Sequence, residues 1–134
     1  MANEAVIIEL INAGEPIRVT VADATALAKG TLMALTTDPR TAIATAATGD
    51  KFIGITATEK VASDGQLSIA VYTKGIFDLK SDATGSAIGV IVAVGGANLT
   101  ETAVEADYPL GNCIGKNLET VGANEVAAVF VYPI

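Results

Sequence analysis

The sequence contains no histidine, no tryptophan and a single cysteine among its 134 residues. Nucleophilic catalysis by a Ser–His or Cys–His pair needs an imidazole, so both arrangements are excluded, although rarer ones remain. A zinc site needs histidine or several cysteines and is excluded as well. One cysteine cannot form an intramolecular disulfide. Cys113 lies in an apolar stretch, where a buried thiol in a strand is expected.

Basic residues are also few. The sequence has eight Lys and Arg residues and fifteen Asp and Glu residues, which gives a net charge of −7. Residues 81–134 contain only one base, Lys116. Binding to nucleic acid by counterion release requires clustered Lys and Arg, and so does binding to an anionic membrane surface. Neither partner is therefore expected.

Long apolar runs are missing too. No run of 18 apolar residues occurs, so the sequence predicts no transmembrane helix. The N-terminus lacks a basic region followed by an apolar one, so no secretory signal is expected.

What the chain has in quantity is small and branched apolar side chains. Hydrophobic residues make up 51% of the sequence, but aromatic residues only 4%. The length suggests one domain, with a core of many small side chains. The excess of apolar over charged residues indicates that some surface is hidden in an oligomer.

Short segments of alternating apolar residues, separated by turn signals, predict a mainly β fold, a small β-barrel or sandwich. One short helix is expected over residues 23–30, capped by Asp23 and ended by Gly30. Residues 2–12 fit a strand or one helix face, and their β-branched side chains favour the strand. Residues 42–48 are weakly specified and are expected to form a loop or an edge, and residues 97–109 are expected to be irregular. The expected strands are 17–21, 31–35, 52–55, 66–72, 76–79, 88–94, 113–118 and 126–131.

Four landmarks recur in order after about 60 residues, which is typical of an internal repeat. Gly30 recurs as Gly89, Phe52-Ile53-Gly54 as Cys113-Ile114-Gly115, Glu59 as Glu119, and Val71-Tyr72 as Val131-Tyr132. We therefore expect an N-terminal arm over residues 1–17. A single β domain follows over 18–134, with a weak duplication over about 29–80 and 88–134. Whether residues 1–17 form an arm or the first strand of the barrel stays open.

Three acidic residues, Glu101, Glu105 and Asp107, lie close together in the sequence. Carboxylates ligate Ca²⁺, but this spacing matches no calcium loop, so a solvated acidic loop is expected. The sequence therefore predicts no metal, no cofactor and no catalytic residue, and the chain is not expected to be an enzyme.

Several segments together resemble the head-decoration, or capsid cement, proteins of tailed bacteriophages. The resemblance runs in order from about residue 29 to the C-terminus. The segments that carry it are 35–42 (LTTDPRTA), 49–56 (GDKFIGIT), 59–62 (EKVA), 71–79 (VYTKGIFDL), 96–99 (GANL) and 114–120 (IGKNLET).

The resemblance implies a structural virion protein located on the outer capsid surface and made in the host cytoplasm. Such a protein decorates and stabilises the capsid, clamping neighbouring major capsid protein subunits as a homotrimer. The N-terminal arm, the segments without a counterpart in the repeat and the acidic loop are then the candidate contacts with capsid or sister subunits. They include Val6, Ile7, Ile8, Leu10, Asp38, Pro39, Arg40 and Phe77.

A second hypothesis is a small β binding module that recognises a carbohydrate or acts as an adhesin-like domain. Its binding face would normally contain aromatic residues, and this chain has only three Phe and three Tyr.

Overall fold

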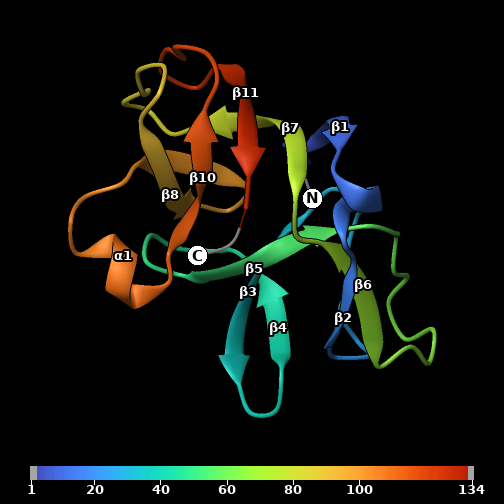
Figure 1. Cartoon of the computed structure of the whole chain (residues 1–134). Coiled ribbons are helices and arrows are strands. Elements are labelled where there is room, and N and C mark those ends of the chain that lie inside the picture. The colour runs from blue at the N-terminus through green and yellow to red at the C-terminus, as the bar shows by residue number, and fades with distance from the viewer. Residues whose placement is uncertain (1–2, 133–134) are drawn as a thin grey trace.

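The computed structural model describes residues 3–132, and over this range the chain is mainly β (Figure 1). Two short helical segments, η1 (Asn12–Gly14) and α1 (Asp107–Leu110), accompany the strands. The strands are β1 (Val6–Leu10), β2 (Ile17–Thr20), β3 (Leu32–Thr37), β4 (Thr41–Ala44), β5 (Lys51–Thr56), β6 (Ser68–Tyr72), β7 (Gly75–Ser81), β8 (Ile91–Gly96), β9 (Leu99–Thr102), β10 (Cys113–Asn117) and β11 (Val126–Val131).

Strands β2 to β6 form a closed barrel in the order β2-β4-β3-β5-β6. The β2–β4 pair is parallel and the other four pairs are antiparallel. Closing the sheet in this way removes most of the unpaired strand edges that a flat five-stranded sheet would expose. We call this unit the first barrel.

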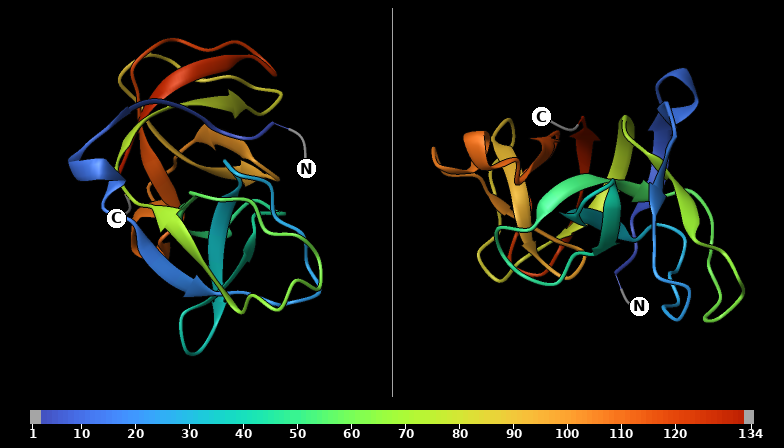
Figure 2. Two further views of the ribbon diagram at one scale, coloured as in Figure 1. Left: turned by 90° about the vertical axis from the view of Figure 1, so that its right-hand side faces the viewer. Right: turned by 90° about the horizontal axis from the view of Figure 1, so that it is seen from below.

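Strands β7 to β11 repeat the same pattern. Here β7 pairs with β9 in parallel, and the pairs β7–β11, β8–β9, β8–β10 and β10–β11 are antiparallel. We call this unit the second barrel. Figure 2 shows the two barrels packed one above the other in its left view. The repeated units run over residues 17–72 and 75–131, so each begins earlier than the sequence indicated.

The strand registers show which residues of the two barrels are equivalent. Gly30 and Gly89 both have positive φ, and their N–H groups donate to Thr56 O and Asn117 O. Gly54 corresponds to Gly115. The last two expected landmarks are displaced, because the loop after β10 is shorter than the loop after β5. Tyr72 pairs with β5 at the same position of the barrel at which Phe130 pairs with β10. The counterpart of Tyr72 is therefore Phe130 and not Tyr132.

Gly54 and Gly115 recur because the backbone approaches closely at both positions. A Cβ on Gly54 would lie 2.6 Å from the carbonyl oxygen of Tyr72. A Cβ on Gly115 would collide with the carbonyl oxygen of Phe130. Both glycines lie at bulges in their strand pairings. What repeats at this landmark is therefore a packing requirement of the barrel.

The N-terminal segment does not extend away from the domain as an arm. Strand β1 pairs antiparallel with β7, with Ile7 opposite Phe77 (Figure 1). Ala5 N–H also donates to Gly30 O at 2.7 Å, which ties the segment to the first barrel. The strand interpretation of residues 2–12 is therefore correct for residues 6–10. The segment contacts the second barrel through β1 and the first barrel through Ala5.

The two barrels share one hydrophobic core in addition to a smaller one inside the first barrel. The smaller core contains Val19, Val21, Leu27, Met33, Ala42, Ile69 and Val71. The shared core joins Ala5, Leu32, Phe52 and Ile55 to Phe77, Leu79, Val92, Val94, Ile114, Val129 and Val131 of the second barrel. Asn98, which is fully buried, accepts a hydrogen bond from Leu32 N–H at 3.0 Å and donates its own N–H to Thr45 Oγ1 at 3.0 Å.

Two expectations about local structure were wrong, and a third, for residues 42–48, had been left open between a loop and an edge. Residues 23–30 are not helical, because Asp23 accepts hydrogen bonds from the loop between β5 and β6, and Leu27 forms a β-bridge with Lys60. Residues 41–44 form β4, and residues 97–109 contain β9 and α1. Both segments are weakly apolar. Each nevertheless contains a strand, because β4 pairs with β2 and β3, and β9 pairs with β7 and β8, which closes each five-stranded barrel. No helix over residues 3–132 is long and apolar enough to cross a membrane.

Candidate interaction surface

Strand β1 presents two apolar side chains to solvent and two to the core. Val6 and Ile8 are 60% and 51% exposed. Ile7 and Leu10 pack against the shared core. The alternation is that of a half-buried strand. Of the four residues predicted on this segment, Val6 and Ile8 are therefore available to a partner, whereas Ile7 and Leu10 stabilise the fold.

Phe77, predicted as a contact residue, is fully buried, so its side chain is not exposed to a partner. Its ring lies 6.1 Å from the ring of Tyr72, between the two barrels. The segment around Phe77 lacks a counterpart in the sequence repeat because its aromatic ring fills the shared core, where the first barrel has Ile17 at the equivalent position.

Asp38, Pro39 and Arg40 form the tip of the β3–β4 hairpin, and all three are exposed. Asp38 and Arg40 border a cavity of about 790 Å³ whose lining also includes Ile17, Leu35 and Ile53. Pro39 borders a smaller cavity of about 350 Å³ on the side of Arg18 and Ser68. The structure thus brings the hairpin next to an apolar surface that sequence reasoning did not identify.

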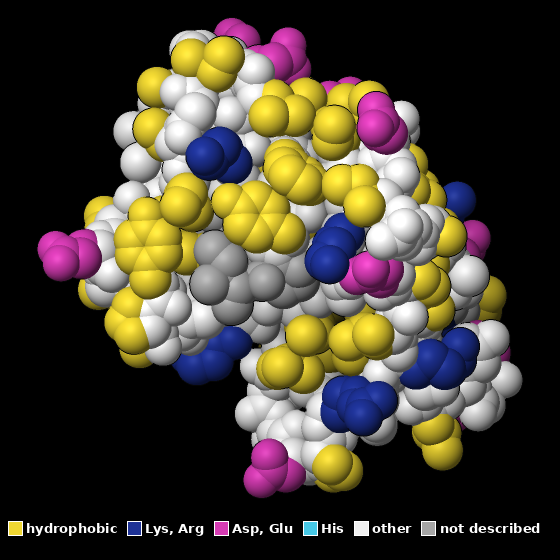
Figure 3. Space-filling model, in the orientation of Figure 1, with side chains coloured by type: hydrophobic (Ala, Val, Ile, Leu, Met, Phe, Trp, Pro, Cys, Tyr) yellow, Lys and Arg dark blue, Asp and Glu magenta, His cyan; other side chains and the backbone are white. Residues whose placement is uncertain are grey.

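We call the larger hollow the open cavity. Ile17 and Leu35 are 39% and 37% exposed within it, and Ile53 is half-buried. Arg40 and Lys51 stand at its border together with Asp38. In Figure 3 the lower part of the molecule carries apolar side chains with Lys and Arg side chains around them. The open cavity therefore combines an apolar floor with a border in which bases outnumber acids.

The equivalent residues of the second barrel are closed off. Strand registers and bulges match Ile17 with Phe77, Leu35 with Val94, and Ile53 with Ile114. Phe77, Val94 and Ile114 are all 0% exposed. They belong to the shared core, in which Leu32, Phe52 and Ile55 of the first barrel cover them. One and the same surface of the repeated unit is thus covered in the second barrel and open in the first.

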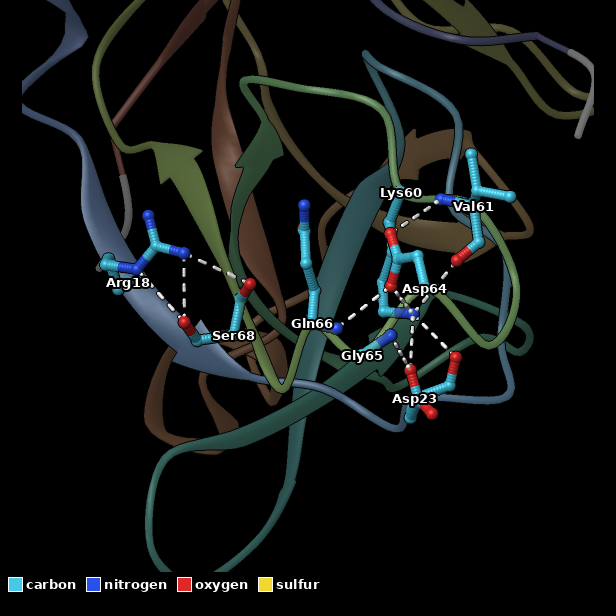
Figure 4. Close-up of polar contacts among 8 residues, drawn as sticks. All are labelled: Arg18, Asp23, Lys60, Val61, Asp64, Gly65, Gln66 and Ser68. Carbon is cyan, nitrogen blue, oxygen red and sulfur yellow. Dashed lines mark hydrogen bonds and ion pairs between the residues drawn. The ribbon is translucent and has the colours of Figure 1, made fainter.

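A buried lysine holds together the other end of the first barrel (Figure 4). The side chain of Lys60 is buried. Its Nζ donates hydrogen bonds to Asp23 O at 2.6 Å, to Val61 O at 3.2 Å and to Asp64 Oδ1 at 3.0 Å. Hydrogen bonds lower the pKa of the Asp64 carboxyl, first from Gln66 N–H and then from Lys60. All donors of the ammonium group have partners, so the network is structural.

The acidic loop between β9 and β10 is built around Asp107. Its carboxylate accepts hydrogen bonds from Val104 N–H at 2.7 Å and from Asn112 Nδ2 at 2.8 Å, and the residue is buried. Burial raises the pKa of the Glu101 carboxyl, and the charges of Asp107 and Asp82 raise it further. Around this loop, Val104, Tyr108 and Leu110 are 62%, 43% and 52% exposed.

Within residues 3–132, no three His, Cys, Asp or Glu side chains gather as a metal site would require. Cys113 is buried at the start of β10, and burial raises the pKa of its thiol. A thiol with a raised pKa is a poor nucleophile near neutral pH.

No family model matches the chain, and no curated protein matches it.

Proposed function

We propose that the chain is a structural virion protein that decorates and stabilises the outer surface of a tailed-phage capsid. In this role it clamps neighbouring major capsid protein subunits, acting as a homotrimer. One support is the resemblance to capsid cement proteins, which is carried by several segments in the same order between residue 29 and the C-terminus.

The observation that carries the proposal is the exposed apolar face of β1. Val6 and Ile8 present branched apolar side chains to solvent on a strand at the end of its sheet. An exposed apolar end strand is an aggregation hazard unless a partner covers it. A capsid subunit that docks against β1 would cover it, with main-chain hydrogen bonds for affinity and side-chain contacts for specificity.

The proposal is tested by adding the purified chain to capsids that lack their decoration protein. We expect the chain to sediment with the capsids and to raise the temperature at which they rupture. Expanded and unexpanded capsids should be compared, because a protein of the mature surface should bind the expanded form. Failure to sediment with either form would overturn the proposal.

A carbohydrate-binding or adhesin-like module is the alternative. The open cavity has the size of a ligand pocket, but none of its lining residues is aromatic, so stacking on a sugar ring is not available there. A glycan array separates the two proposals, and selective glycan binding would favour this alternative.

A further inference from the structure

We propose that the open cavity of the first barrel is a second docking site for the major capsid protein. Its occupant is a segment of a capsid subunit in which apolar side chains lie beside Asp or Glu residues. The cavity is lined by β2, β3, the β3–β4 hairpin and β5, so it is separate from the exposed face of β1. The inference rests on the proposed function for the identity of the partner, and on the residues of the cavity for the chemistry of the contact.

The floor of the open cavity is a surface that protein covers elsewhere in the same chain. Ile17, Leu35 and Ile53 correspond to three residues of the second barrel that are 0% exposed, and side chains of the first barrel cover those residues. Ile17 and Leu35 are branched and apolar, although more than a third of each is exposed. Ile53 also packs against the core inside the first barrel. An apolar segment in the cavity would therefore extend an existing core and remove this floor from water.

The residues around the floor differ in charge between the two barrels. Arg40 and Lys51 border the open cavity, and Arg18 lies next to Arg40. The strand registers match Arg18, Arg40 and Lys51 with Asp78, Asn98 and Asn112 of the second barrel. Asn98 and Asn112 are buried, and Asn98 forms the hydrogen bonds that join the barrels. Cations replace one acid and two amides, so the two floors require covers of different charge.

These three bases have no acidic partner within residues 3–132, where none of them forms an ion pair. Arg18 donates hydrogen bonds to Ser68, and Arg40 donates one to a backbone carbonyl at 3.4 Å. Of the described residues that line the cavity, only Asp38 is acidic. The chain has only eight bases and a net charge of −7, so an acidic segment is repelled by most of its surface and attracted here. Carboxylates on the occupant would therefore fix where it binds.

Two separate docking surfaces would let one copy hold two capsid subunits, with β1 on one subunit and the open cavity on its neighbour. Once the first contact has formed, the second is intramolecular, so both can be weak and the attachment still firm. The cavity thus supplies the second contact that a clamp requires.

The first test measures binding to capsids that lack their decoration protein, by sedimentation. Leu35→Glu should lower binding by at least about tenfold, because it places a carboxylate where the occupant presents its own. Lys51→Glu, at an exposed strand position where folding does not depend on the side chain, should lower binding by about fivefold. The matched control is Lys116→Glu, which makes the same charge change at an exposed base of the second barrel and should keep wild-type binding.

The second test identifies the occupant. Thr37 is exposed on the border of the cavity, and it is replaced with the photoreactive residue benzoylphenylalanine. After binding to capsids and irradiation, mass spectrometry should find cross-links to a capsid-protein peptide that contains Asp or Glu beside apolar residues. The same replacement at Leu67, which is 64% exposed and lies outside the cavity, should not label that peptide.

The outcomes separate this inference from the proposed function. Wild-type binding that is unchanged in both Leu35→Glu and Lys51→Glu would overturn the inference and leave the proposed function standing. Cross-links from Thr37 only to another copy of this chain, or to a capsid segment without acidic residues, would do the same. A wild type that fails to bind capsids would overturn both.

Discussion

At the scale of single residues, the most unusual feature is the buried ammonium group of Lys60. A charged side chain is rarely fully buried unless its charge is paired and its donors are satisfied. Here two backbone carbonyls and the Asp64 carboxylate satisfy it, with Asp23 Oδ1 at 3.8 Å. The equivalent bridge of the second barrel joins Ser86 to Val121, so the repeated fold itself does not require a lysine. Lys60 compensates for the longer loop after β5, which it ties to Asp23.

Replacing Lys60 with methionine should lower the free energy of unfolding by about 2 to 3 kcal/mol, since buried acceptors lose a charged donor. Methionine keeps the apolar stem, so packing is retained. Chemical denaturation measures the loss, and Lys29→Met, at an exposed lysine, should change stability by less than about 0.5 kcal/mol.

The same network has a pH signature. The pKa of Asp64 is lowered in the fold, so its contribution to stability is present above its ordinary pKa and is lost as pH falls through the folded value. In Lys60→Met one cause of the lowered pKa is removed, so acid should destabilise the variant less steeply than wild type. An identical acid dependence in both proteins would contradict this role.

At the scale of elements, β1 decides how the N-terminal segment functions. If residues 2–12 formed an arm, deleting them would weaken capsid binding more than it lowers folding stability. The structure changes that expectation, because the deletion would also remove Ala5, Ile7 and Leu10 from the shared core. Substitutions on the exposed face separate the two effects.

We predict that the double substitution Val6→Ser and Ile8→Ser lowers capsid binding at least tenfold. It should change stability by less than about 1 kcal/mol, because both side chains are more than half exposed. Ile7→Ala should do the reverse, lowering stability by about 2 kcal/mol with binding retained in the folded fraction. Sedimentation with capsids and chemical denaturation measure the two quantities. Unchanged capsid binding by the double variant would remove β1 from the proposed contact.

The observed strands show which sequence patterns predict the elements of this fold. Alternating apolar residues placed β2, β6, β10 and β11 within a few residues of their observed bounds. Asp23-Ala24-Thr25 and Asp82-Ala83-Thr84 form a further repeat in the sequence. The backbone carbonyl of each aspartate accepts a hydrogen bond from the loop that precedes the last strand of its barrel. This repeat extends the duplicated region back to Asp23 and Asp82, and it argues against a helix over residues 23–30.

At the scale of the whole molecule, the shared core makes the two barrels one folding unit. Leu32, Phe52 and Ile55 are buried only because the second barrel packs on them, and Asn98 connects the two barrels through buried hydrogen bonds. Because neither barrel keeps this core when the other unfolds, we expect a single cooperative transition.

Asn98→Gly tests this coupling. Glycine keeps the positive φ of Asn98 but removes the acceptor of Leu32 N–H, which should cost about 1 to 3 kcal/mol. Calorimetry should show one transition at a lower temperature, with equal calorimetric and van't Hoff enthalpies. Arg40→Gly, at the equivalent exposed hairpin position, should show no comparable loss. Two resolved transitions in wild type would contradict the coupling.

The sequence by itself determined the mainly β class, the short strands, the repeated Gly54 and Gly115, and the lack of imidazole chemistry. These follow from residue type and period, which act locally. Only the tertiary structure decided that the repeat is a pair of closed barrels, that Phe77 is core, and that the surface around Ile17, Leu35 and Ile53 stays open while its counterpart is covered. The physical reason is that burial is a property of neighbours distant in the sequence, so two equivalent segments acquire different roles once one barrel packs on the other.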